Sequence, residues 1–138
     1  MKKASILSLI VFFVISGCTP YNHYYKLDKQ YLARRQLETK QYDTSDKTLV
    51  LRAVISTMQD LGFIIETADE KLGIISGTSY TNTKTSKLNV FVHKTNDKQI
   101  VVRANAQVGL KALDNPIPYQ NFFNALGQSL FLEAHEVE

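Results

Sequence analysis

The stretch LNVFVHKTNDKQIVVRANAQ, residues 88–107, contains two alternating segments on either side of a polar turn. Apolar side chains recur at every second position from Leu88 and again from Ile100. Asn96 and Asp97 lie between these segments, and both residue types tolerate the positive φ angle of a tight turn. Alternation across a short connection predicts an antiparallel β-hairpin with one buried face.

Further segments extend this hairpin into a sheet. Residues 63–68 lead through the polar turn 69–71 into residues 72–80, which alternate in the same way. Residues 36–42, with Leu37 as the only strongly apolar residue, are expected to form a polar edge strand. The sequence therefore predicts an antiparallel sheet of four to five strands.

Helical periodicity appears in two segments. Residues 47–61 follow a cluster of N-cap residue types and precede Gly62, and they carry an apolar stripe of Val50, Val54, Met58 and Leu61. Residues 119–134 carry a second stripe, formed by Tyr119, Phe122, Leu126 and Leu130. Phe123 and Phe131 flank that second stripe and are expected in the core, because a small domain needs its aromatic side chains for burial.

These elements follow one another in the order β-α-β-β-β-β-α. Such a chain buries its apolar surface most simply as an α+β two-layer sandwich, with the antiparallel sheet in one layer and both helices on one face of it. The opposite face of the sheet, which carries Arg103, Asn105 and Gln107, would then meet water.

The N-terminus has the layout of a lipoprotein signal peptide. Lys2 and Lys3 precede an apolar stretch, residues 6–15, that is too short to span a bilayer as a helix. The tetrad that follows resembles a lipobox, with its branched apolar residue, two small residues and cysteine: Ile15, Ser16, Gly17 and Cys18. We expect cleavage before Cys18 and acylation, such as palmitate, on its thiol.

Two alternatives compete with this interpretation of the N-terminus. The segment is either an ordinary secretory signal with an incidental cysteine, or an anchor that is never cut. Cys18 is the only cysteine of the chain, so it has no partner for a disulfide within the chain. A free thiol is a liability in an oxidising compartment, and lipidation removes it.

The sequence accordingly divides into a signal peptide (1–17), a lipidated tyrosine-rich tether (18–35) and a single α+β domain (36–138). A tyrosine ring with its polar tip suits membrane and protein interfaces alike. The tether tyrosines Tyr21, Tyr24, Tyr25 and Tyr31 therefore contact the membrane, a partner or their own domain, and the sequence leaves these three possibilities open.

Charge and residue spacing argue against several function classes. The chain has 16 Lys and Arg against 13 Asp and Glu, and loss of Lys2 and Lys3 with the signal lowers the basic count to 14. A nearly neutral mature chain gives no electrostatic case for nucleic acid. The histidines His23, His93 and His135 are scattered, so neither a metal site nor a cofactor is expected, and no catalytic constellation is present.

The connection 108–118 carries apolar residues outside the periodic pattern of the core. Leu110, Leu113 and Ile117 lie in this predicted loop, and apolar loop residues either tuck under a core or face a partner. Together with Tyr21, Tyr24 and Tyr25, they are the expected contacts with a partner protein.

Two motifs give the chain a resemblance to known proteins. Gln59-Asp60-Leu61-Gly62-Phe63 and Leu72-Gly73-Ile74-Ile75, behind a lipidated cysteine and a tyrosine-rich tether, resemble small outer-membrane lipoproteins of uncharacterised role. Over residues 36–133 the element order is similar to the repeated domains of BamC-type lipoproteins of the β-barrel assembly machinery. This resemblance implies a scaffold or assembly role, although a fold alone does not fix a function.

The expected function is that of a non-enzymatic lipoprotein of the cell envelope. It would act as an accessory or assembly subunit that binds an envelope protein, and it would have no nucleic-acid partner. Thr19 follows the lipidated cysteine, and aspartate at that position retains such proteins at the inner membrane, so the outer membrane, facing the periplasm, is expected. The alternative is a periplasmic binding module for lipid, peptidoglycan or a small ligand.

Overall fold

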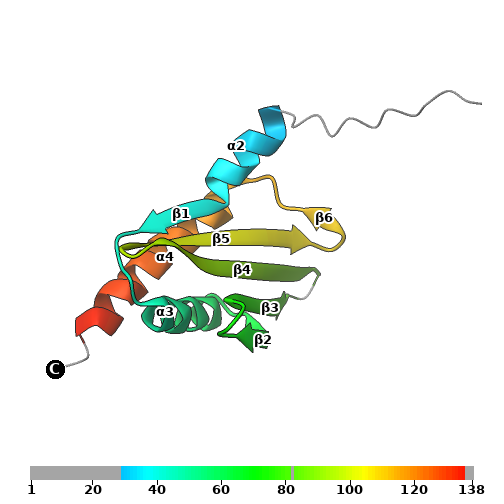
Figure 1. The fold of residues 1–138 in the computed structure, drawn as a ribbon. Helices are drawn as coiled ribbons and strands as arrows, with labels where there is room; N and C mark the ends of the chain where they lie inside the picture. Colours follow the sequence, from blue (N-terminus) through cyan, green and yellow to red (C-terminus); the bar gives the residue numbers. More distant parts are fainter. Residues whose placement is uncertain (1–28, 82, 136–138) are drawn as a thin grey trace, which may run out of the picture.

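The computed structural model describes residues 29–81 and 83–135. Within these residues, helices and strands follow one another as α2 (Lys29–Leu37), β1 (Thr39–Tyr42), α3 (Lys47–Asp60), β2 (Ile64–Asp69), β3 (Ile74–Tyr80), β4 (Thr85–Asn96), β5 (Gln99–Val108), β6 (Lys111–Ala112) and α4 (Pro116–His135). Figure 1 shows their arrangement.

The strands form one antiparallel sheet in the order β1-β5-β4-β3-β2, and the two-residue strand β6 also pairs with β5. The predicted hairpin is β4–β5, in which Leu88 lies opposite Ala106 and Val92 opposite Val102. This register places the alternating apolar side chains of both strands on the same face. The alternation in the sequence therefore identified the buried face correctly.

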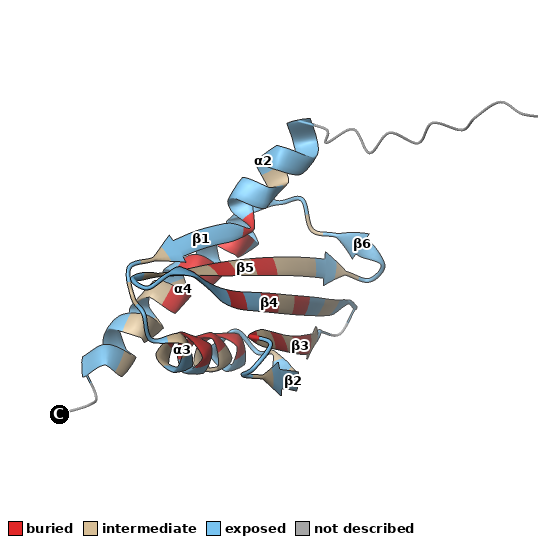
Figure 2. Ribbon diagram, in the orientation of Figure 1, coloured by how far each residue is buried: buried red, intermediate tan, exposed pale blue. Residues whose placement is uncertain are grey.

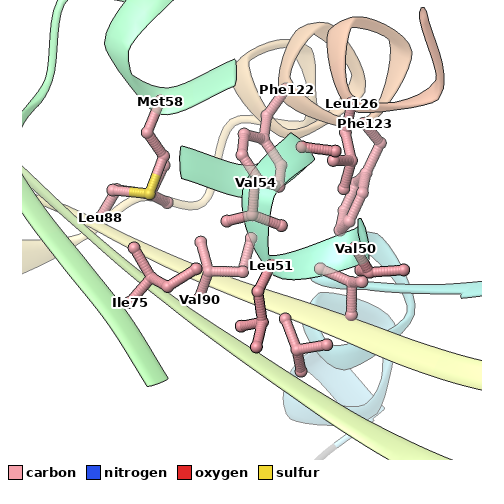
Figure 3. Close-up of a cluster of buried hydrophobic side chains, with 14 of the residues drawn as sticks. Val50, Leu51, Val54, Met58, Ile75, Leu88, Val90, Phe122, Phe123 and Leu126 are labelled. Carbon is pink, nitrogen blue, oxygen red and sulfur yellow. The ribbon is translucent and has the colours of Figure 1, made fainter. Parts of the chain in front are cut away.

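The helices lie on one side of the sheet, so the predicted α+β two-layer sandwich is confirmed (Figure 1). Figure 2 shows that the buried residues concentrate in α3, α4 and the central strands. In Figure 3, Met58 of α3 lies against Leu88, and Val54 lies between the sheet and Phe122 of α4. The stripe residues Val50, Val54, Met58, Tyr119, Phe122 and Leu126 are all buried.

Local signals set the bounds of α3. The carboxylate of Asp46 accepts a hydrogen bond from the backbone N–H of Leu49 at 2.9 Å and so caps the helix. Gly62 ends the helix with a φ of 81°, a conformation that favours glycine. Leu61, at this C-terminal cap, is exposed rather than buried with the rest of its stripe.

Several predicted boundaries were wrong. Residues 29–37, expected as tether and strand, form α2, and the strand begins only at Thr39. The segment is rich in strong helix formers such as Leu, Ala, Arg and Gln. Because α2 has no buried residue, it has no apolar stripe that would have revealed it in the sequence.

The second predicted helix starts earlier than expected. α4 begins at Pro116, because proline is tolerated in the first turn, and the side chain of Asn115 accepts a hydrogen bond from the N–H of Ile117 at 3.0 Å. Phe123 is buried as predicted, but Phe131 is 62% exposed, which corrects the prediction that both lie in the core. The C-terminal turns of α4, which carry Phe131, reach beyond the sheet (Figure 1).

Candidate functional site

An apolar recess lies where the end of α3, the β4–β5 hairpin and the start of α4 meet. Its volume is about 340 Å³. The buried side chains Leu88, Tyr119 and Phe122 line it, together with the half-buried Phe63 and Leu113. Exposed residues also line it, and we call these its rim: Leu61, Pro118 and Asn121. Lys87 and Gln107 border the recess as well, but they alternate with Leu88 and Ala106, so their side chains lie on the other face of the sheet.

The hydroxyl of Tyr119 fixes one wall of the recess. It donates a hydrogen bond to the carbonyl oxygen of Leu113 at 3.1 Å and accepts one from the N–H of Ala106 at 3.2 Å. The N–H of Leu113 in turn donates to the carbonyl oxygen of Ala106 at 2.9 Å. These three bonds hold the connection between β6 and α4 against β5.

Burial also affects the acidity of this tyrosine. Removal of the phenol from water is the largest influence, and it raises the pKa of Tyr119 above its ordinary value. The hydroxyl therefore stays protonated at neutral pH and keeps both its donor and its acceptor role in the wall.

The predicted contact residues of the 108–118 connection have different environments. Leu110 is fully exposed at the turn between β5 and β6, where Gly109 has a φ of 61° and its N–H donates to the carbonyl oxygen of Thr85. Ile117, in the first turn of α4, is 57% exposed. Leu113 is half-buried, packs against the core and lines the recess.

The remaining predicted site residues lie outside the described residues. These are the cleavage and lipidation residues Ile15, Ser16, Gly17 and Cys18, and the tether tyrosines Tyr21, Tyr24 and Tyr25. Tyr31, the last tether tyrosine, lies on α2 and is 41% exposed, with the guanidinium of Arg35 5.7 Å from its ring centre. Among the described helices none is long and apolar enough to cross a membrane.

In the part of the chain that the structure describes, titratable side chains do not gather into a metal centre. No group of three or more His, Cys, Asp or Glu residues converges within residues 29–81 and 83–135. His93 is exposed on β4, and His135 packs edge-on against the ring of Phe131 at the end of α4.

The buried carboxylate of Glu38 was not predicted from the sequence. Glu38 lies between α2 and β1, its residue is 2% exposed, and its side chain forms an ion pair of 3.4 Å with Arg103 of β5. The Arg34 side chain of α2 also forms an ion pair, with Asp114 beside the recess. Together they tie α2 to the edge of the sheet and to the connection that forms the recess wall.

The recess itself was not foreseen either. Leu113 is the only one of its lining residues that the sequence predicts as a candidate contact. Periodicity shows which side of each element is buried, but it does not show where the ends of two helices leave a gap above the sheet.

No protein-family model matches the chain, and no curated protein matches it. Among solved structures, the chain is similar to the adenylate sensor from AMP-activated protein kinase, crystallised in complex with ZMP. The two share 10% sequence identity and a TM-score of 0.47, over 67% of this chain and 94% of that one.

Proposed function

We propose that this chain is a non-enzymatic, lipid-anchored lipoprotein of the cell envelope that binds an envelope protein as an accessory or assembly subunit. The anchor is an acyl group on Cys18. The domain faces the periplasm from the outer membrane.

The anchoring part of the proposal is supported by the order of the N-terminal signals. A basic start, an apolar stretch and the lipobox-like residues 15–18 follow one another, and Thr19 carries no inner-membrane retention signal. Eleven residue steps separate Cys18 from Lys29, where the described residues begin. A fully extended chain covers roughly 36 Å over that span, so the domain works close to the membrane.

The exposure of Leu110 is the single observation that carries the partner-binding part. A leucine at a two-residue turn contributes nothing to the core when it is fully exposed. Ile117 is the second exposed apolar side chain of the same connection. Protein interfaces take most of their binding energy from a few apolar anchors of this kind.

The assembly role follows from the resemblance of residues 36–133 to BamC-type lipoproteins. The apolar recess favours the second candidate function, a binding module for a lipid or another small ligand, because it is concave and mostly apolar. The two functions are compatible, since Leu110 and Ile117 do not line the recess.

Pull-down from detergent-solubilised cells, followed by mass spectrometry, tests partner binding. We expect the full-length protein to recover a defined envelope protein, and the Leu110→Ala, Ile117→Ala double variant to recover at least about tenfold less, a loss of ~1.4 kcal/mol. The unfolding midpoint of the variant should match the wild type, because both side chains are exposed.

Substitution of Lys98, which is exposed at the turn at the other end of the β4–β5 hairpin, is the control and should leave recovery unchanged. Recovery that is equal for the double variant and the wild type would contradict the proposed contact.

A further inference from the structure

The outer side of α4 carries almost no charge. Glu133 is the only Asp, Glu, Lys or Arg among the 20 residues of the helix, although about a quarter of the residues of an ordinary domain are charged. Exposed side chains from its second turn onward are amides and then apolar groups: Gln120, Asn121, Asn124, Gln128, Phe131 and Leu132. Depletion of charge, together with exposed aromatic side chains, distinguishes the centre of a protein interface from the rest of a surface.

This side of the helix has a hollow next to a projecting ring. Gly127 lies one turn after the buried Phe123, and there is open space where its Cβ would stand. Phe131 follows one turn later and is 62% exposed, in the part of α4 that reaches beyond the sheet (Figures 1 and 2). These three residues line a shallow groove, which Lys40 of β1 borders.

Nothing in the described part of the chain requires glycine at position 127. Glycine weakens the interior of a helix relative to alanine, because it loses more conformational freedom on folding. A Cβ at this position would meet no side chain and no other segment within 4 Å. A second helix that approaches closely, with a bulky side chain in the hollow, would explain the missing Cβ.

The spacing of the hollow and the ring allows two copies of α4 to fill each other. Gly127 and Phe131 are four residues apart, which is about 6 Å along a helix. If two copies lie antiparallel about a two-fold axis at the level of Ser129, each Phe131 lies over the Gly127 of the other copy. One contact then fills both hollows, because a two-fold axis repeats every residue pair.

The absence of charge on this side also favours a second copy over an unrelated partner. Across a two-fold axis, a charged side chain near the axis meets its own like charge, whereas an amide both donates and accepts hydrogen bonds and can pair with itself. Gln128 lies next to the proposed axis. Lys40 borders the groove, but its ammonium lies 5.7 Å from the ring centre of Tyr42 in its own chain, so it is directed along its own strand.

We propose that α4 forms the contact of a homodimer, in which the helices of two copies pack antiparallel and Phe131 of each copy lies over Gly127 of the other. The contact spans about three helical turns, which is at the low end of interface sizes, so the dimer dissociates on dilution. It is separate from the proposed partner contact, since Leu110 lies on the β5–β6 turn and Ile117 lies about 15 Å before Gly127 along the helix.

Disulfide crosslinking in intact cells tests the geometry. The full-length variants Gln128→Cys and Asn121→Cys each add one exposed thiol to α4, and the unchanged protein is the blank. Along the helices, the two thiols at position 128 are offset by about 3 Å and those at position 121 by about 24 Å. A disulfide joins Cα atoms no more than ~7 Å apart.

We expect oxidant to produce a disulfide-linked homodimer of Gln128→Cys, and neither Asn121→Cys nor the blank should exceed background. An equal yield for the three proteins would overturn the proposal, as would a Gln128→Cys protein that stays monomeric or that crosslinks only to a different protein.

Exchange of the ring and the hollow tests the pairing itself. In the Gln128→Cys protein, Phe131→Ala removes the ring and Gly127→Phe fills the hollow, and each should lower the crosslinked fraction at least about threefold, because a few seated side chains supply most of the energy of a contact. The combined Gly127→Phe, Phe131→Gly variant places a ring opposite a hollow again and should restore the fraction.

These positions leave the core unchanged, because Phe131 is exposed and Gly127 has open space beside it. Leu110→Ala, in the proposed partner contact, is the control and should leave the crosslinked fraction unchanged. Crosslinking that survives both single changes, or an exchange variant that crosslinks no better than Gly127→Phe alone, would overturn the proposed pairing.

Discussion

The Tyr119 hydroxyl donates a hydrogen bond to the carbonyl oxygen of Leu113, with 3.1 Å between the two oxygen atoms. This bond joins the first turns of α4 to the connection that precedes the helix. It explains why an 11-residue segment with two prolines, 108–118, lies in an ordered path over the sheet. Leu110 projects from one end of this path, and Leu113 closes the recess near its middle.

Tyr119→Phe tests the importance of this hydroxyl for the fold. The change leaves the Leu113 carbonyl and the Ala106 N–H without their partner, and an unsatisfied buried group costs about 1–3 kcal/mol. We expect a loss of that size in the free energy of unfolding, measured by urea denaturation. Tyr80→Phe, at a residue that is 67% exposed, should change it by less than ~0.5 kcal/mol.

Two glycine-to-alanine changes should have opposite effects on stability. Gly127 lies within α4 with open space where a Cβ would stand, so Gly127→Ala should stabilise the protein by about 0.5–1 kcal/mol. A Cβ on Gly77 would come within 2.8 Å of the Ile64 carbonyl oxygen and 2.9 Å of the Met58 methyl, so Gly77→Ala should destabilise it by about 1–3 kcal/mol. Thermal unfolding of both variants checks the signs, and the same sign for both would contradict the packing of β3 against α3.

Alkaline pH should destabilise the protein through Tyr42. Burial raises the pKa of this phenol above its ordinary value of 10.0, and its hydroxyl is buried without a hydrogen-bond partner among the described residues. Above about pH 10 the unfolded chain therefore loses this proton while the folded protein keeps it, so the free energy of unfolding falls as the pH rises. Tyr42→Phe should make that fall shallower, and Tyr80→Phe should not. Denaturation from about pH 8 to about pH 11, which brackets the ordinary tyrosine pKa of ~10, measures both slopes.

Acylation of Cys18 has a direct test in cells. Cys18→Ser should abolish incorporation of a clickable palmitate analogue and leave an unprocessed precursor, because the acyl acceptor is gone. Wild-type protein without label, together with normal processing of the serine variant, would contradict the lipoprotein assignment. Ser16→Thr, beside the cleavage position, is the control for a general effect of substitution and should retain the label.

The sandwich could be predicted from the sequence because the core residues of each helix and strand recur with a short-range period. Val50, Val54 and Met58 recur at helical spacing, and Leu88, Val90 and Val92 alternate, so each pattern identifies its own buried face. Parts of the fold without such a pattern were missed. α2 has no buried face, β6 has only two residues, and the start of α4 lies among prolines that looked like a loop.

The candidate site was predictable only in part. Leu110 and Ile117 stood out because they are apolar residues outside any periodic pattern, and both are exposed. The recess depends on the position of α4 above β4 and β5, which no local pattern encodes. The Glu38–Arg103 ion pair joins residues 65 positions apart, so the sequence contained no signal for it.

Site-specific photo-crosslinking at Leu110 tests the central claim, that this residue contacts an envelope protein, most directly. A photoreactive phenylalanine analogue replaces Leu110 in the full-length protein, and intact cells are irradiated. We predict one discrete crosslinked species that contains an envelope protein, and none when the analogue replaces Lys98 at the opposite end of the β4–β5 hairpin. Crosslinks to lipid alone, or no crosslink at Leu110, would contradict the proposed partner contact.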